Sequence, residues 1–307
     1  SGSGGPVSVA GGAQFVSPGG HLAFVAPRVT TAAGSSVNAG DLGTAAYGAV
    51  DSFEIQFIPI GNNDLAFFTF LVPGVAAGTA QTTPLDLAGT TRGANVYLTA
   101  ISRQGLAGLL INAPGLLEGR SSVANYGQVT ITTGRNITLG QVNELSTPVD
   151  GAQTGHVRLG QIDAAGNVNI FLSGANGSGD VQADRVRAGQ AMLILANNVT
   201  VGAGGLIAGD ANVNAGALRI VAAGTVDVPL VQARTNFDIF PGAARGPGNV
   251  VTQPIIRLGT ATAGGFISLS NTRAITAQSL TAGGNFTVAN ATSFNAGSVT
   301  SGGEILF

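Results

Sequence analysis

The chain has 307 residues and a formal net charge of −2, and only 9% of its residues are charged while 44% are hydrophobic. This balance excludes a disordered tail, which combines low hydrophobicity with high net charge, and the lack of a basic stripe argues against nucleic acid as a partner. The absence of Cys excludes disulfides and thiolate metal sites. Abundant Gly, with frequent Val, Ile, Thr and Asn, predicts many short strands joined by tight turns.

No apolar run reaches the roughly 18 to 20 residues that a membrane-spanning helix needs, so we predict no transmembrane segment. The chain begins SGSGG, without Met. We therefore expect a processed product, an internal fragment or a trimmed form of a longer protein. Its length would fit two ordinary domains, but single all-β solenoids also reach this size, and we predict one domain over residues 1–307.

The first distinctive segment, residues 51–87, contains two strand-like runs, FEIQFIPI and LAFFTFLV, on either side of the turn GNND. Two such runs around an Asn/Asp turn predict a β-hairpin. We expect this hairpin to lie outside the main body, to pack on one flank and to offer a contact surface. The aromatic candidates for that surface are Phe53, Phe57, Phe67, Phe68 and Phe70.

Downstream of the hairpin, apolar residues recur at the second and fourth positions after a glycine, which predicts short strands with one buried face. These pairs are Val129 and Ile131 after Gly127, Val168 and Ile170 after Gly166, Ala191 and Leu193 after Gly189, and Leu218 and Ile220 after Gly216. The same template extends to Ile137, Leu139 and Val142, to Val199 and Val201, and to Val226, Val228 and Val231. The run GANGSG before Val181 reads as an inserted loop.

Two further segments depart from the template. Residues 143–154 are polar and loop-like, and residues 233–263 carry three prolines, Pro241, Pro247 and Pro254. In repeat proteins such insertions form loops on one face and often make the binding surface, although they can also be excursions without a role. The candidate contact residues in the second segment are Arg234, Arg245 and Arg257.

The C-terminal segment repeats a Gly-Gly pair that begins at Gly264, Gly283 and Gly302, at intervals of 19 residues. The alternating apolar residues that follow are Ile267 and Leu269, Phe286 and Val288, and Ile305 and Phe307; farther along, Ile275, Ala277 and Leu280 correspond to Phe294, Ala296 and Val299. We interpret the glycine pair as a corner where Gly supplies a positive φ. Asn271 and Asn290 would form a turn ladder, and Thr281 and Thr300 an outward stack.

One repeat cannot bury its apolar face alone, whereas stacked repeats share a continuous core. With about three short strands per repeat, the sequence predicts an all-β fold, a single parallel β-helix of about 19-residue coils with the hairpin outside it. About ten to a dozen coils at ~4.8 Å each would give a rod about 50 to 60 Å long. A β-barrel or sandwich is the main structural alternative, but neither keeps one register over a fixed 19-residue period.

The template stops on inward residues, Ile305 and Phe307. An open solenoid end exposes unpaired strand edges, which favour association. We expect this end either to be continued by more chain or to pair with another molecule, and the second option would build a homo-oligomeric filament by end-to-end stacking.

Residues suited to catalysis are few and scattered. Parallel β-helices also host polysaccharide lyases and hydrolases, which need clustered carboxylates in a groove. Asp163, Asp184 and Asp210 lie about one coil apart, and their convergence would favour such an enzyme. The remaining candidates are Asp180, Arg185 and Arg187, near Asp184, and two histidines, His21 and His156, expected at the surface. We predict no catalytic site, no metal site and no cofactor.

Gly19–Phe57 resembles the secretion-domain region of filamentous-haemagglutinin-like exoproteins, the secreted partners of bacterial two-partner secretion systems. The residues that match the first part of that region are Gly19, Gly20, Leu22, Phe24, Ala26, Pro27 and Val29. A later Pro-Gly turn and "Glu-x-Arg-Ser" segment are matched by Pro114, Gly115, Glu118, Arg120 and Ser121. The Asn-Pro-Asn-Gly-type motif near the start of the family's secretion domain is missing, so the chain is expected to enter that domain part-way.

The resemblance implies a right-handed parallel β-helix with extra-helical hairpins, exported through a dedicated outer-membrane transporter to the surface of a Gram-negative bacterium or beyond it. It also implies adhesion, aggregation or biofilm formation, with a host or bacterial surface glycan or protein as the partner. We therefore expect a secreted or cell-surface adhesive module without catalysis. A filament or surface-layer subunit that assembles end to end and a polysaccharide-processing β-helix enzyme are the alternatives.

Overall fold

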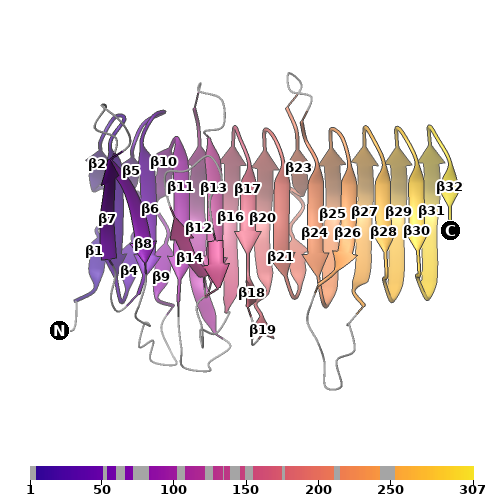
Figure 1. Ribbon diagram of the computed structural model, residues 1–307, viewed down its shortest axis with the longest axis horizontal. Coiled ribbons are helices and arrows are strands. Elements are labelled where there is room, and N and C mark those ends of the chain that lie inside the picture. Colours follow the sequence, from indigo (N-terminus) through magenta and orange to yellow (C-terminus); the bar gives the residue numbers. More distant parts are fainter. Residues whose placement is uncertain are drawn as a thin grey trace.

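The structure, a computed structural model, describes residues 5–50, 54–59, 66–71, 83–101, 108–121, 127–133, 135–138, 146–148, 155–174, 177–210, 215–242 and 253–307. Their regular secondary structure is all β, and they include no helix long and apolar enough to cross a membrane. The chain winds between two sheets of parallel strands, and its termini lie at opposite ends of the stack (Figure 1). The prediction of an all-β, parallel solenoid is thus confirmed.

In the described part of the chain, one sheet has 11 strands, each paired in parallel with the equivalent strand of the preceding coil. We use "coil" for one circuit of the solenoid and "ladder" for residues at equivalent positions of successive coils. The strands are β3 (His21–Ala26), β6 (Thr44–Ala49), β11 (Asn95–Ala100), β13 (Gln128–Thr133), β17 (Val168–Phe171), β21 (Met192–Ala196), β24 (Leu218–Ala222), β26 (Phe237–Pro241), β28 (Ile267–Ser270), β30 (Phe286–Ala289) and β32 (Ile305–Leu306).

The second sheet has 15 strands among the described residues and supplies the other wall of each coil. Its main path is β1 (Val7–Val9), β4 (Val29–Thr31), β9 (Leu85–Leu87), β12 (Leu109–Gly119), β16 (His156–Ala164), β20 (Val181–Ala188), β22 (Val199–Val201), β25 (Thr225–Ala233), β27 (Ile255–Ala263), β29 (Ala274–Ala282) and β31 (Ser293–Ser301). Off this path lie β2 (Gln14–Val16), β5 (Ser36–Asn38), β10 (Thr90–Gly93) and β23 (Leu206–Ala208).

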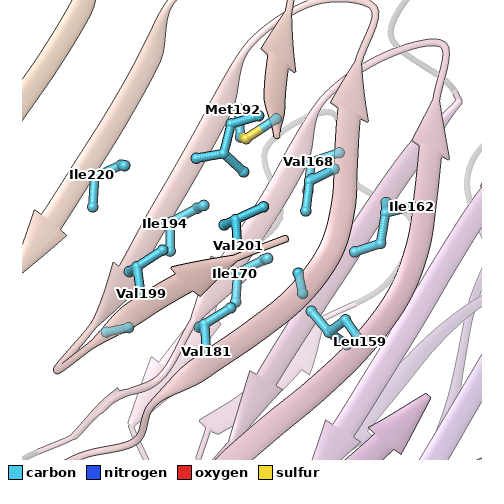
Figure 2. Close-up of a cluster of buried hydrophobic side chains, with 14 of the residues drawn as sticks. Leu159, Ile162, Val168, Ile170, Val181, Met192, Ile194, Val199, Val201 and Ile220 are labelled. Atoms are coloured by element: carbon cyan, nitrogen blue, oxygen red, sulfur yellow. The ribbon is translucent and has the colours of Figure 1, made fainter. Parts of the chain in front are cut away.

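The core lies between these two sheets and runs along the stack as one cluster of apolar side chains. Figure 2 shows its middle, where Ile170 and Ile194 of the 11-stranded sheet and Leu159 and Val199 of the 15-stranded sheet lie within the space that the strands enclose. Each coil adds its inward residues to the ladder of the coil before it. Burial of this continuous apolar surface is the main favourable term for folding.

The C-terminal coils have the predicted register. Strands β27, β29 and β31 pair so that Ile256, Ile275 and Phe294 form one ladder, each 19 residues from the next. The predicted inward residues Ile267, Leu269 and Leu280 are fully buried. The corner ladder is confirmed as well, because Asn290 Nδ2 donates to Asn271 Oδ1 at 2.9 Å, and Thr281 pairs with Thr300 in register. Farther upstream the interval varies, for example 24 residues between Ile170 and Ile194 but 19 between Leu218 and Phe237.

Each C-terminal coil contributes two strands rather than the expected three. The second is a nine-residue strand, as in β27 and β29, whose ladder skips Gly259 and Gln278 at its middle. The strand therefore bends at a corner without ending there. At this corner a Cβ on Gly259 would lie 2.1 Å from the carbonyl oxygen of Pro229 in the preceding coil.

The Gly-Gly corners have a different cause from the one predicted. No glycine of the three pairs, all of which are described, has a φ in the left-handed region, whereas Asn271 and Asn290 do, at 51° and 54°. A Cβ on Gly283 would instead lie 2.1 Å from the carbonyl oxygen of Gly264. Glycine is needed there because two coils approach closely, and the left-handed corner falls on the asparagines.

Two groups of predicted inward residues are wrong. Ala191 and Leu193 are partly exposed, while Met192 and Ile194 are buried, because the strand begins one residue later than the glycine template places it. A slip of one residue moves every side chain of a strand to the opposite face. Ile137 belongs to β14 (Arg135–Thr138), which pairs antiparallel in a separate sheet and forms no part of the solenoid wall. Leu139 and Val142 lie outside the described residues.

The predicted hairpin is present as β7 (Glu54–Pro59) and β8 (Ala66–Leu71), which pair antiparallel and place Phe57 opposite Phe68. Within the described residues they form a four-stranded sheet with β14 and β15 (Ser146–Pro148). This sheet lies against the 11-stranded sheet, where β14 contacts β11 (Figure 1). We call it the extra-helical sheet. The chain has returned to the solenoid by Leu85, so β9, assigned to the hairpin segment from sequence, is a wall strand.

Of the other predicted insertions, some parts belong to the walls of the solenoid and other parts leave it. The GANGSG run carries a small antiparallel hairpin of β18 (Ser173–Gly174) and β19 (Gly177–Ser178). Of the segment predicted as a loop over 233–263, most is solenoid, because β26 and β27 are wall strands. Residues 243–252 lie outside the described part, as do most of residues 143–154.

Candidate functional site

Asparagine occupies the position directly before three strands of the 11-stranded sheet, as Asn167 before β17, Asn236 before β26 and Asn285 before β30. Asn167 Oδ1 accepts the backbone N–H of Ala191 at 3.0 Å, and Asn236 Oδ1 accepts that of Phe266 at 3.2 Å. Asn285 Oδ1 accepts the backbone N–H of Glu304 at 3.1 Å. Each bond joins one coil to the next, so the asparagine oxygen satisfies a corner donor that the sheet itself leaves without a partner.

Phe266 occupies this ladder between Asn236 and Asn285, and its side chain is 39% exposed. A shallow pocket of about 430 Å³ opens around it on the outside of the solenoid. The two asparagines, Ser268 and Thr287 provide its polar lining, and Gly265 and Gly284 lie at the corner. Ser268 and Thr287 are paired residues on the outer face of β28 and β30. We call this the Phe266 pocket.

Asp238 lies beside this pocket, since it pairs with Ser268 across β26 and β28. Its side chain is buried, and the Arg219 guanidinium approaches its carboxylate at 3.6 Å while also lying 5.2 Å from the Phe240 ring. Burial raises the pKa of Asp238, and the charge of Arg219 offsets only part of that effect. The carboxylate is therefore less readily ionised than an aspartate in water.

The acidic residues considered for catalysis do not form a free cluster. Arg187 lies between two of them, with Asp163 at 2.9 Å and Asp210 at 3.2 Å. Asp184 occupies the bend of β20, where the ladder skips it. In the described residues, no group of three or more His, Asp or Glu side chains is arranged to hold a metal ion.

The two histidines lie on the outside, as predicted. His21 is exposed on β3, and His156 on β16 is partly exposed. His156 Nδ1 accepts the backbone N–H of Asp180 at 3.1 Å. The Asp180 carboxylate in turn accepts hydrogen bonds from the Nδ2 groups of Asn197 and Asn198, at 3.2 and 2.8 Å. These hydrogen bonds stabilise one corner of the solenoid, which is a structural role.

Two residues from the matched "Glu-x-Arg-Ser" segment join an ion-pair chain across successive coils. Arg92 contacts Asp41 at 2.8 Å and Glu118 at 3.7 Å, and Glu118 also pairs with Arg120. Three of these four side chains are more than a third exposed, so each pair contributes little to stability.

Of the contact residues predicted from sequence, the structure describes the side chains of Arg234 and Arg257. Arg257 stands on the wall strand β27, exposed and paired in register with Asp227, and Arg234 lies at the turn after β25. The structure therefore does not bring them together in a loop as predicted. Phe53 and Arg245 lie outside the described residues, and for Phe57, Phe67, Phe68 and Phe70 the strands but not the side chains are described.

Both end faces of the 307-residue chain expose apolar side chains. At one end Phe307 is 78% exposed and its ring lies 5.3 Å from that of Phe294, and Ile305 is 46% exposed. At the other end Phe15, 40% exposed, contacts Phe24 edge-on at 5.3 Å.

Sequence reasoning missed the Phe266 pocket. Alignment of the coils on their Gly-Gly pairs places Phe266, Asn285 and Glu304 at one position, but only the structure shows that Asn236 precedes them in that ladder. A large aromatic residue at a corner position that the next two coils fill with Asn285 and Glu304 was the available signal. No protein-family model, curated protein or solved structure matches this chain, so the likeness to filamentous-haemagglutinin-like exoproteins rests on the residues of the chain alone.

Proposed function

We propose that this chain is an adhesive module of a secreted or surface-displayed bacterial exoprotein, in which the solenoid is a stiff rod and its flanks present the binding surfaces. The observation that carries the proposal is the continuity of the wall: the 11-stranded sheet runs from β3 to β32 around one apolar core. Such a stack resists bending because every coil is hydrogen-bonded to the next. A rod of this kind suits the display of contact sites away from a cell surface.

The finer features of the fold belong to the same proposal. We take the helix to be right-handed, with the 19-residue interval of the C-terminal coils as its basic unit and the longer upstream intervals as insertions in that unit. Export through an outer-membrane transporter of a two-partner system rests on the resemblance of Gly19–Phe57. The proposal contains no catalytic step, since Arg187 already engages the carboxylates of Asp163 and Asp210.

The adhesive function is tested with beads that carry the purified chain through a terminal tag. We expect these beads to bind to cultured epithelial cells or to bacterial cells more than beads coated with albumin do, and soluble chain to compete with them. Equal retention of the two kinds of beads on both cell types would overturn the adhesive function. A second set of beads that carry heat-unfolded chain separates adhesion by the folded rod from adhesion by exposed apolar sequence.

Assembly end to end is a second candidate, favoured by the exposed apolar residues on both end faces, among them Phe15 and Phe307. Strand edges at these ends would pair in register if one chain stacked on the next. Electron microscopy over a range of protein concentrations tests this. Filaments with the repeat of one rod would support a polymer subunit, and isolated short rods at every concentration would exclude it.

A further inference from the structure

Phe266 differs from the residue on either side of it in its ladder. Its neighbours Asn236 and Asn285 each bond to the next coil through Oδ1, and a phenyl ring has no oxygen with which to do so. The ring is instead 39% exposed on the flank of the rod. Positions where a sequence departs from a consistent structural pattern without a gain in packing are expected at functional sites.

The presence of phenylalanine at position 266, where the neighbouring ladder positions hold asparagine, also opens space in the next coil. A Cβ on Gly265 or Gly303 would collide with the Oδ1 of the preceding asparagine, at 2.3 Å from Asn236 and 2.2 Å from Asn285. Gly284 is the equivalent glycine in the coil after Phe266, and the atom nearest to a Cβ on Gly284 would be 3.5 Å away. Phenylalanine in place of asparagine therefore removes a corner bond and leaves room at Gly284, within the pocket.

We propose that the Phe266 pocket binds an uncharged pyranose sugar, the terminal or penultimate unit of a surface glycan. The apolar face of a pyranose, with its axial C–H groups, stacks on an exposed aromatic ring, whose face is electron-rich. Around the ring, the Nδ2 groups of Asn236 and Asn285 offer donors, and the hydroxyl groups of Ser268 and Thr287 both donate and accept. This inference rests on the proposed adhesive function and names the class of its ligand.

The charges around the pocket select against acidic sugars. The lining side chains named above are uncharged. Beyond them, the exposed Glu304, bonded through its backbone to Asn285, places a negative group near the pocket, while the Asp238 carboxylate is buried beside Arg219. A carboxylate or sulfate on the ligand would be repelled by Glu304, whereas a neutral hexose carries no charge to be repelled.

The volume of the pocket, about 430 Å³, falls within the range of roughly 300–1,000 Å³ that small-ligand sites occupy. Because the pocket is shallow and open to solvent, one site buries only part of a sugar, and we expect a Kd on the order of 1 mM. Avidity from many rods on one surface would then supply useful adhesion.

The test uses the full chain and saturation-transfer NMR with lactose, cellobiose and N,N′-diacetylchitobiose as neutral probes and 3′-sialyllactose as the acidic probe. We expect at least one neutral disaccharide to bind and sialyllactose to bind no better than lactose. Phe266→Asn should weaken binding at least about tenfold without lowering the urea midpoint, because asparagine restores the ladder bond. Phe266→Tyr, which keeps the ring, should bind as the parent chain does.

Leu42→Asn is the matched control, because Leu42 is an exposed apolar residue, 64% accessible, near the opposite end of the chain. It should leave sugar binding unchanged. The inference fails if no neutral disaccharide binds at concentrations up to about 50 mM, well above the expected Kd, or if Phe266→Asn binds as the parent does. If the beads adhere to cells but either of these sugar-binding results is obtained, the proposed adhesive function stands and the sugar site is wrong. If the chain binds sugar but its beads do not adhere, the adhesive function is wrong and the sugar site stands.

Discussion

At the scale of single residues, close approach between coils decides which glycines can be replaced. A methyl group on Gly283 would meet the carbonyl oxygen of Gly264 at 2.1 Å, a contact that only a shift of the coils can relieve. We expect Gly283→Ala to lower the free energy of unfolding by about 1–3 kcal/mol, the usual cost of overpacking. The midpoint of urea unfolding measures this.

Gly284 is the matched control for that variant, since it is the next residue and a methyl group there would find its nearest neighbour at 3.5 Å. Gly284→Ala should change the free energy of unfolding by no more than about 0.5 kcal/mol. Equal losses in the two variants would show that backbone freedom of the Gly-Gly pair, and not contact with Gly264, is what the corner requires.

The buried carboxyl of Asp238 gives a prediction about pH. Its pKa is raised in the folded chain, so the folded state binds more protons than the unfolded state between the two pKa values, and its contribution to stability falls as pH rises through that window. We expect Asp238→Asn, which is neutral at every pH, to raise the melting temperature at pH 7, with a gain of about 1 kcal/mol or less. At about pH 3, where the carboxyl is protonated in both states, the gain should vanish.

Differential scanning calorimetry of parent and variant at the two pH values is the measurement. A gain that persists unchanged at low pH would mean that ionisation of Asp238 is not what the variant relieves. A loss of stability at pH 7 would mean that the pairing of Asp238 with Arg219 outweighs its burial, contrary to the direction of the pKa shift.

Much of the residue-level pattern could be predicted from the sequence where coils have equal length. Ile267, Leu269 and Leu280 are buried as predicted because a constant interval keeps the register of one coil in the next. The reason why the Gly-Gly corners require glycine could not be predicted, since a sequence does not show which atom an added Cβ would contact. The Phe266 pocket required the hydrogen bond of Asn236 to show that the ring interrupts a ladder.

At the scale of elements, the extra-helical sheet changes the environment of the wall beneath it. In β6, β11 and β13 nearly every residue is buried, on both faces, whereas β28 and β30 alternate between buried and partly exposed. Thr132 on β13 is fully buried, and its hydroxyl group has no hydrogen-bond partner among the residues that the structure describes. A second small cluster around Val50 and Ile101 lies outside the main core in the same region.

We therefore expect a charge introduced under the extra-helical sheet to be costly. Thr132→Lys should destabilise the chain by about 3 kcal/mol or more, because its ammonium group would be buried without a partner. Thr287→Lys, on the open outer face of β30, should change stability by less than about 0.5 kcal/mol. Urea unfolding of both variants measures the two free energies of unfolding. If lysine is tolerated at both positions, the extra-helical sheet does not exclude water from the wall beneath it.

Elements that leave the solenoid were only partly predictable. The hairpin of β7 and β8 was found because two strand-like runs surround an Asn/Asp turn. The strand that contains Ile137 was assigned to the wall in error, because an alternating pattern looks the same in a parallel wall strand and in an antiparallel excursion. The slip at Ala191 arose because the interval between coils varies upstream, and a period-two pattern changes face with a single extra residue.

At the scale of the whole molecule, each coil of the described solenoid wall pairs with the coils next to it, so the stability of the wall is approximately a sum over coils and interfaces. A coil in the middle is held on two sides, and a coil at the end on one. The difference is visible in one ladder: Ile275 is 1% exposed, whereas Phe294, one coil nearer the end, is only partly buried. We expect opening to begin at the two ends and to proceed inward.

Amide hydrogen exchange, read by mass spectrometry of peptides, measures this gradient. Peptides from β27 and β29 should exchange more slowly than those from β31 and β32, and slowest of all should be the middle of the stack around β16 and β20. Ile275→Ala, which removes apolar contacts from a buried ladder, should cost about 2–5 kcal/mol and should extend fast exchange from β31 to β29. Phe294→Ala should cost less, because its ring is already partly in water.

The dependence of amide hydrogen exchange on protein concentration distinguishes an isolated rod from rods that stack end to end. An isolated rod keeps the same gradient at every concentration, because its end strands have no partner. If chains stack end to end, β32 and the strands of the first coil become protected together as concentration rises, since each end would cover the other, and Phe307→Ser would abolish that protection. Uniform protection along the rod at all concentrations would contradict both modes, because it would require a chain that unfolds as one cooperative unit.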